Sequence, residues 1–118
     1  MNNELKKVNK AIRFINEVLT LKELFKPIKE QHTATAIFQE KKLEIMMKKH
    51  KAKLPLTTSP IAFVSQFRSI FQEKTFQLKR QVKNDVLVSV SIFEEGTNAL
   101  FPFSKIKFIE MISKLNFD

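Results

Sequence analysis

With 118 residues, 43% of them hydrophobic and 28% charged, the chain is expected to form a single globular domain over residues 1–118. It has no cysteine, which excludes disulfides, iron–sulfur clusters and thiol catalysis, and fits a reducing, cytoplasmic compartment. The net charge of +9 favours an anionic partner: nucleic acid, an acidic protein or an anionic membrane surface. The single glycine excludes glycine-rich phosphate loops, and no apolar run is long enough to cross a bilayer.

Two helices are predicted in the first half of the chain. In residues 3–20 apolar side chains recur every three or four positions, and the opposite side is basic: Lys6, Lys7, Lys10 and Arg13. Thr20 to Glu23 has the form of a capping box, which predicts a short second helical segment ending before Pro27. Residues 34–50 are rich in helix formers and are predicted as a helix. Their apolar residues do not gather on one face, so either the helix is buried on several sides or the segment from Thr33 to Phe38 is extended.

The segment from residue 60 to residue 83 is predicted to be one long helix. Ser59 can cap its first turn, and Pro60 suits the first helical position because its missing N–H needs no partner there. Apolar side chains then follow at helical spacing: Phe63, Val64, Phe67, Ile70, Phe71, Leu78 and Val82. Lys74 falls inside this stripe and Phe76 outside it, so the pattern is imperfect.

Beyond residue 83 the apolar residues alternate. Val86, Val88, Val90 and Ile92 are expected on one face of a strand, with serines at 89 and 91 on the other. Residues 94–98 carry the turn-forming Gly96, and residues 99–103 are predicted as the returning strand of a β-hairpin. Pro102 restricts that strand to a sheet edge, or marks the end of the strand. A continuation of the long helix is the alternative, although the β-branched residues favour a strand.

A final helix is predicted after Ser104, which can cap it. The expected fold is therefore α+β and mostly α: three helices, one of them long, then a hairpin and a C-terminal helix. This order resembles that of winged-helix domains, at the level of element order alone. An all-α bundle is the alternative.

Two basic clusters are the candidate binding sites. Residues 41–53 contain six lysines and one glutamate, and residues 74–83 form a second run with no acidic residue between Glu73 and Asp85. On the predicted long helix, the cations at 79, 80 and 83 share one side. The two clusters form one phosphate-contacting patch if those helix ends are neighbours. The alternative is a solvated surface with lysines favoured at helix C-termini. The candidate residues are Lys41, Lys42, Lys48, Lys49, Lys51, Lys53, Lys79, Arg80 and Lys83.

No catalytic, metal or cofactor site is predicted. His32 and His50 lack the further ligands that zinc requires, and His50 is assigned to a solvated, lysine-rich surface. Glu94 and Glu95 are adjacent in a turn, unlike the facing carboxylates of acid–base catalysts. Phe76, between lysines, is a candidate for stacking on bases, although packing against a neighbouring helix is the more common role.

The expected function is that of a small, non-enzymatic nucleic-acid-binding protein, with DNA as the expected form, that contacts phosphates through the two clusters. The alternative is an interaction module, such as an inhibitor, adaptor or secretion chaperone, that binds an acidic protein or self-associates as a homodimer. Twelve phenylalanines and four methionines motivate it, with Met46 and Met47 as an adaptable surface. Attachment of the first helix to an anionic membrane is less favoured, and no small-molecule substrate is predicted. The sequence leaves open whether the charge reflects binding or base composition.

Overall fold

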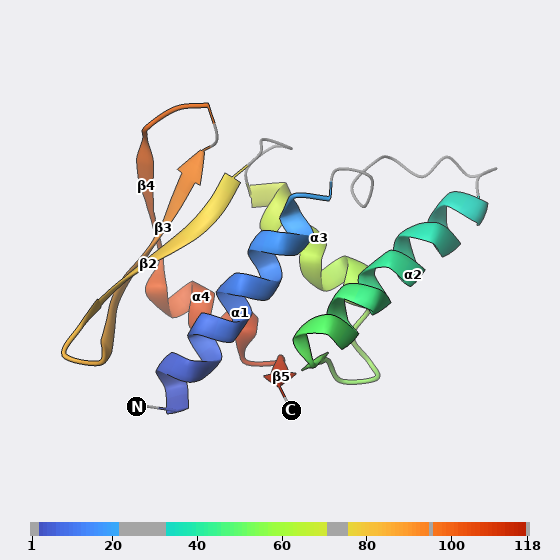
Figure 1. Ribbon diagram of the computed structural model, residues 1–118, viewed down its shortest axis with the longest axis horizontal. Coiled ribbons are helices and arrows are strands. Elements are labelled where there is room, and N and C mark those ends of the chain that lie inside the picture. Colours follow the sequence, from blue (N-terminus) through green and yellow to red (C-terminus); the bar gives the residue numbers. More distant parts are fainter. Residues whose placement is uncertain (1–2, 22–32, 71–75, 95, 118) are drawn as a thin grey trace.

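The computed structural model describes residues 3–21, 33–70, 76–94 and 96–117 (Figure 1). These residues form four helices and two antiparallel sheets, so the predicted α+β class is confirmed and the all-α bundle is wrong. The helices are α1 (Asn3–Leu19), α2 (Thr33–His50), α3 (Pro60–Ile70) and α4 (Lys105–Ile112). The strands are β1 (Ala52–Lys53), β2 (Phe76–Lys83), β3 (Val86–Glu94), β4 (Leu100–Phe103) and β5 (Asn116–Phe117).

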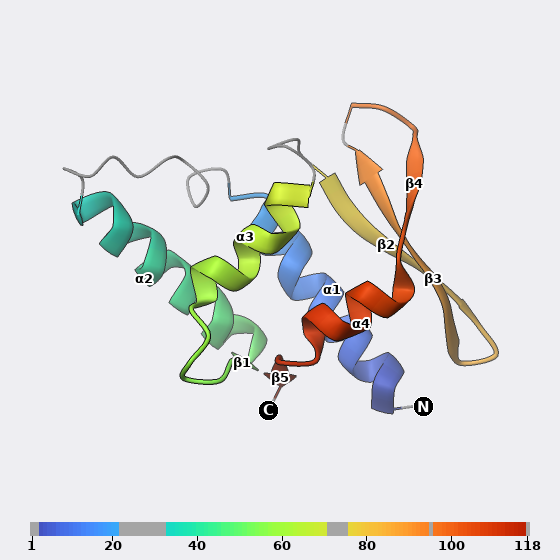
Figure 2. The ribbon, with the colours of Figure 1, turned by 180° about the vertical axis from the view of Figure 1, so that it is seen from behind.

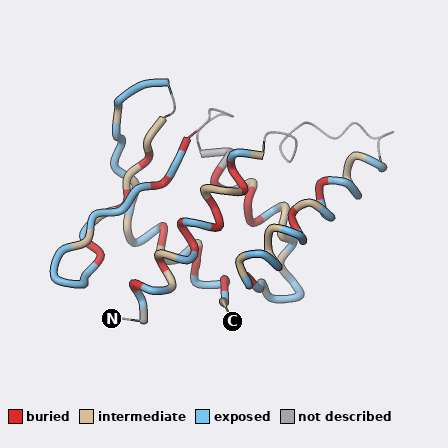
Figure 3. The backbone as a smooth tube through the Cα atoms, in the orientation of Figure 1, coloured by how far each residue is buried: buried red, intermediate tan, exposed pale blue. Residues whose placement is uncertain are grey.

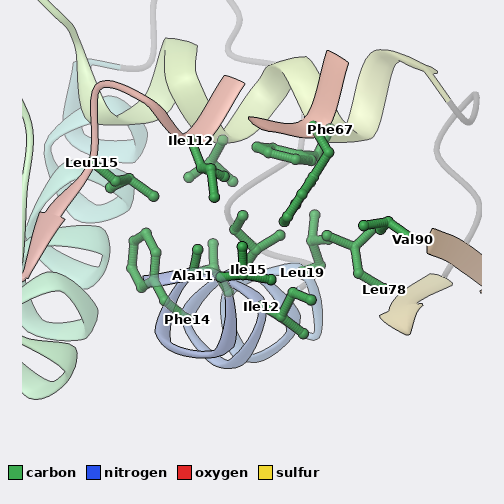
Figure 4. Packing of buried hydrophobic residues seen from close by; sticks show 14 of the residues in the cluster. Ala11, Ile12, Phe14, Ile15, Leu19, Phe67, Leu78, Val90, Ile112 and Leu115 are labelled. Atoms are coloured by element: carbon green, nitrogen blue, oxygen red, sulfur yellow. The ribbon is translucent and has the colours of Figure 1, made fainter. Parts of the chain in front are cut away.

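Helix α1 is the centre of the molecule. It lies between α2 on one side and the three-stranded sheet β2-β3-β4 on the other, as Figure 1 shows. Helices α3 and α4 lie behind α1 in that view and in front of it in Figure 2. Burial is concentrated along α1 (Figure 3), where five side chains have no exposed surface: Val8, Ala11, Phe14, Ile15 and Val18. Its apolar side chains point toward Phe67 of α3, Leu78 of β2 and Ile112 of α4 (Figure 4). A helix buried this widely leaves only a narrow polar side in solvent.

The predicted long helix is wrong from residue 76 on, where the chain is a strand. Helix α3 ends at Ile70, and β2 begins at Phe76. Residues 71–75, which include Phe71 and Lys74, lie outside the described part of the chain. In β2 the side chains alternate, with Phe76 and Leu78 each 2% exposed and Gln77 exposed between them. Leu78 and Val82 misled the prediction because a spacing of four keeps two side chains on one side of a helix and also on one face of a strand.

A tight turn joins β2 to β3. Asn84 and Asp85 both have left-handed backbones, with φ of 53° and 61°. Two consecutive residues of this conformation make the type I′ turn that matches the twist of a hairpin, and Asn and Asp tolerate it better than other non-glycine residues. Asn84 and Asp85 were therefore a turn signal in the sequence. The prediction of a helix over residues 60–83, directly before them, obscured it.

The predicted hairpin between residues 86 and 103 is confirmed as β3 and β4, and Pro102 does lie on an edge strand. The predicted faces of β3 are wrong in part. Gln81 pairs with Ser89 but Val82 pairs with Leu87, so Val88 is an extra residue at a β-bulge. The bulge shifts the alternation by one residue. Leu87 is buried in consequence, whereas Val86 is 53% exposed and Val88 48%.

Helix α2 is continuous from Thr33, so the extended alternative for its first residues is wrong. Three of its apolar residues lie away from the core and face solvent: Ile37, Phe38 and Ile45 are 53%, 52% and 62% exposed. Met46 and Met47, predicted as an adaptable surface, are half-buried: each packs against the core and keeps part of its surface in solvent.

The remaining predicted elements are found in part. Ser104 caps α4 by accepting a hydrogen bond from the Lys107 N–H at 3.2 Å. The chain after Leu21 lies outside the described residues up to residue 32, and with it most of the predicted second segment. Strand β1 pairs with β5, and three described strands lie between α3 and α4, so the winged-helix-like order is not confirmed. No helix in the described ranges is long and apolar enough to cross a membrane.

Candidate nucleic-acid interface

The polar side of α1 is a line of exposed cations. Lys6, Lys10 and Arg13 recur at steps of four and three residues and are exposed. Glu17 continues the line one turn further and is partly exposed. Because the rest of α1 is packed into the core, these side chains have fixed neighbours on both flanks.

Strand β2 is attached to one flank of α1 by two asparagines. The Asn16 amide donates to the Leu78 carbonyl at 3.0 Å, and the Leu78 N–H donates to Asn16 Oδ1 at 2.8 Å. Two turns earlier on the same side, Asn9 Oδ1 accepts a hydrogen bond from Arg80 Nε. These contacts hold the cations of β2 beside the polar side of α1.

A hollow of about 520 Å³ opens along this junction. Arg13 of α1 and Lys79 and Arg80 of β2 are its cationic lining. The helical prediction placed Lys79 and Arg80 on the same side, and they do not share one. They are adjacent in a strand, so Arg80 turns to Asn9 of α1 while the Lys79 ammonium lies 4.2 Å from the centre of the Phe93 ring.

The end of α2 is attached to the other flank of α1 by Glu17. The carboxylate pairs with the Lys49 ammonium and accepts from His50 Nε2 at 2.5 Å. The hydrogen bond from Lys49, and then that from His50, lowers the pKa of Glu17 below its usual value. The His50 ring also packs on Phe14, with centroids 5.6 Å apart. The assignment of His50 to a solvated surface is therefore wrong, since it is half-buried at a helix–helix contact.

A second hollow, of about 330 Å³, lies at this junction, and all of its lining residues are basic: Lys10, Arg13, Lys49, His50 and Lys51. Lys51 takes part because the chain turns there. Its backbone is left-handed, with φ of 55°, and its N–H bonds to the Lys48 carbonyl at 3.1 Å as the helix ends.

Arg13 lines both hollows and so joins the two predicted clusters. A single patch was predicted only if the ends of the two predicted helices were neighbours, but the second cluster lies on strand β2. The two clusters meet across α1, whose polar side lies between them. Lys10 and Arg13 were missed as site residues, although their spacing on the polar side of the first predicted helix was a usable signal. Asn9 and Asn16 offered only a weaker signal, because the sequence shows them merely as two polar residues, seven positions apart, beside an apolar stripe.

The structure places the nine predicted residues in different surroundings. Four lie around Arg13: Lys49, Lys51, Lys79 and Arg80. Lys41 and Lys42 lie about two turns earlier on α2 and line neither hollow, and the Lys42 ammonium is 5.4 Å from the Phe38 ring centre. Lys48 and Lys53 face a different hollow beside α3. Lys83 is exposed at the end of β2, next to the hairpin turn.

The remaining candidate residues do not add to this surface. Phe76 is 2% exposed and packs in the core, so it is not a stacking ring. His32 and Glu95 lie outside the described residues. Among the residues that the structure describes, no group of three or more His, Asp or Glu side chains is arranged to hold a metal ion.

Comparison of the chain with protein-family models, with curated proteins and with solved structures gives no significant match. Function must therefore be inferred from the surface itself.

Proposed function

We propose that the protein binds nucleic acid, DNA above all, through the phosphate backbone. The contact region is the Arg13 surface, which comprises Lys10, Arg13, Lys49, Lys51, Lys79 and Arg80. One observation supports the proposal most strongly. Arg13 lines both hollows, so cations from α1, from the end of α2 and from β2 form one continuous surface.

The charge balance of this surface favours an anionic ligand. Six cations gather around the two hollows. A carboxylate, that of Glu17, lies near them in the described residues, and it is already paired with Lys49 and His50. Like charges held near one another repel, and a bound anion removes that repulsion. The hollows also match the ligand, because a phosphate group in a concave site is reached by donors from more than one element.

In this proposal affinity comes mainly from counterion release. Arg13 and Arg80 supply planar guanidinium groups suited to phosphate oxygens, and the lysines act as point charges. The β2–β3 hairpin flanks the contact region, as a wing does in winged-helix domains, with Lys83 as a further phosphate contact near its tip. Contacts of this kind position the protein on the duplex and read little sequence. We place the protein in the cytoplasm, and we expect no catalytic step.

The test is fluorescence anisotropy with labelled duplex DNA, single-stranded DNA and RNA across a salt series. The label is on the nucleic acid because the protein has no Trp or Tyr. Six phosphate contacts predict a log–log salt slope of about −5 on duplex DNA and about −4 on a single strand. We expect micromolar or tighter duplex binding near physiological salt. Binding that is undetectable at low salt would overturn the proposal.

A further inference from the structure

A third hollow, of about 610 Å³, opens where the end of α2, strand β1 and the start of α3 meet. It has no lining residue from α1, so it is separate from the two hollows around Arg13. Lys51 is the one residue it shares with them. Two of the predicted basic residues, Lys48 and Lys53, line this hollow. They line neither of the two hollows around Arg13.

The floor of the hollow is apolar. Met47, Ala52 and Pro60 line it. Ala52 is 6% exposed and belongs to the core, while Met47 is half-buried and packs against it. Apolar surface in an open hollow gains about 25 cal/mol for each Å² that a ligand covers. The flexible thioether of Met47 can adapt to the shape of a bound side chain.

The rim of the hollow is cationic. Lys48, Lys51 and Lys53 line it and are exposed, against the single carboxylate of Glu44. Lys48 and Lys51 alone outweigh Glu44, so the hollow carries positive charge. Helix α3 begins at Pro60, so the positive end of its dipole adds to the same sign.

We propose that this hollow docks a short acidic segment of a partner protein. One bulky apolar side chain of the segment lies over Met47 and Ala52, and a flanking carboxylate pairs with Lys48. Charge complementarity selects this partner. A second copy of this chain carries +9 and would bring positive charge to the lysines. Nucleic acid has the charge but no aliphatic side chain to cover the floor. The docking site stands independently of the Arg13 surface.

The direct test follows the methionine methyl groups by NMR in the full chain, with Met47 assigned through a Met47→Leu variant. The probe is a short synthetic peptide of glutamates around one leucine. One matched peptide replaces the glutamates by glutamine, and another replaces the leucine by serine. We expect the acidic leucine peptide to shift the Met47 signal and leave that of Met111 on α4 in place. Each matched peptide should bind at least about tenfold more weakly, equivalent to about 1.4 kcal/mol.

Two variants of α2 supply the control. Lys48→Glu should weaken the peptide at least about tenfold. Lys41→Glu makes the same charge change on an exposed lysine two turns earlier and should have a much smaller effect. Three results would overturn the proposal: a Met47 signal that does not move with saturating peptide, equal binding of the glutamine peptide, or equal losses in the two variants. A duplex oligonucleotide that shifts Met47 as strongly would assign the hollow to nucleic acid instead.

Discussion

Asn16 on α1 and Leu78 on β2, sixty-two residues apart, exchange two hydrogen bonds of 3.0 and 2.8 Å. Strand β2 is an edge of its sheet, and the Asn16 amide gives the Leu78 peptide group the pairing that a neighbouring strand would provide. This contact closes the edge locally and aligns β2 with α1. Arg80, two residues further along the strand, lines the same hollow as Arg13.

Loss of the Asn16 side chain should therefore destabilise the fold. Asn16→Ala leaves the part-buried N–H and C=O of Leu78 without partners, which is expected to cost about 1–3 kcal/mol. Chemical denaturation followed by far-UV circular dichroism measures the change. Gln81→Ala, on an exposed position of β2, is the control and should change stability by less than about 0.5 kcal/mol. Equal effects in the two variants would show that the amide contact contributes nothing.

The β2–β3 turn offers a stabilising substitution. Asp85 has φ of 61°, a conformation that costs an L-residue free energy and glycine almost none. Asp85→Gly should therefore stabilise the protein, by about 1 kcal/mol or less, and raise its thermal midpoint. The same change at Asn98, an exposed residue whose φ is not positive, should lower the midpoint instead. A lower midpoint for Asp85→Gly would contradict the assigned turn.

The sequence predicted those elements whose signals are local. The apolar spacing of α1, the Ser104 cap of α4 and the edge position of Pro102 each depend on neighbouring residues, and each is confirmed. The strand that begins at Phe76 was missed because Leu78 and Val82 fit a helix as well as a strand. The phase of β3 was missed because the bulge at Val88 is a property of the pairing with β2.

The candidate site was harder to predict than the fold. The lysines were visible as two runs, but whether they meet depends on which element packs between them. The contacts Asn9–Arg80 and Glu17–His50 decide this, and each joins residues far apart in the chain. Without those contacts Arg13 appears as one more surface cation of an amphipathic helix.

Glu17 should make stability depend on pH. Its pKa is lowered in the folded state by Lys49 and then His50, below the ordinary value of 4.5. A lowered folded-state pKa gives stability that is present above 4.5 and is lost as pH falls through the folded value. Glu17→Gln should therefore be less stable at neutral pH, by no more than about 1 kcal/mol because the pair is partly exposed. The difference from wild type should shrink in acid. Denaturation midpoints at a series of pH values measure it, and a constant difference would contradict the ion pair.

The same substitution should strengthen binding. Glu17→Gln removes the carboxylate from the basic surface and releases Lys49 to contact phosphate. Duplex affinity at low salt is expected to rise several-fold, and the salt slope to steepen by about one. Anisotropy titrations measure both quantities. Glu110→Gln, on the exposed side of α4, changes net charge equally and should leave the slope nearly unchanged.

The measurement that tests the Arg13 surface most directly compares the duplex salt slopes of wild type, Arg13→Glu and Lys107→Glu. The two variants change net charge equally, but Lys107 is exposed on α4, behind α1 (Figure 2). We expect Arg13→Glu to lose at least about tenfold in affinity and to flatten the slope by about one to two, while Lys107→Glu stays close to wild type. Equal losses and equal slopes in the two variants would mean that binding follows net charge alone, and the continuous surface through Arg13 would have no role.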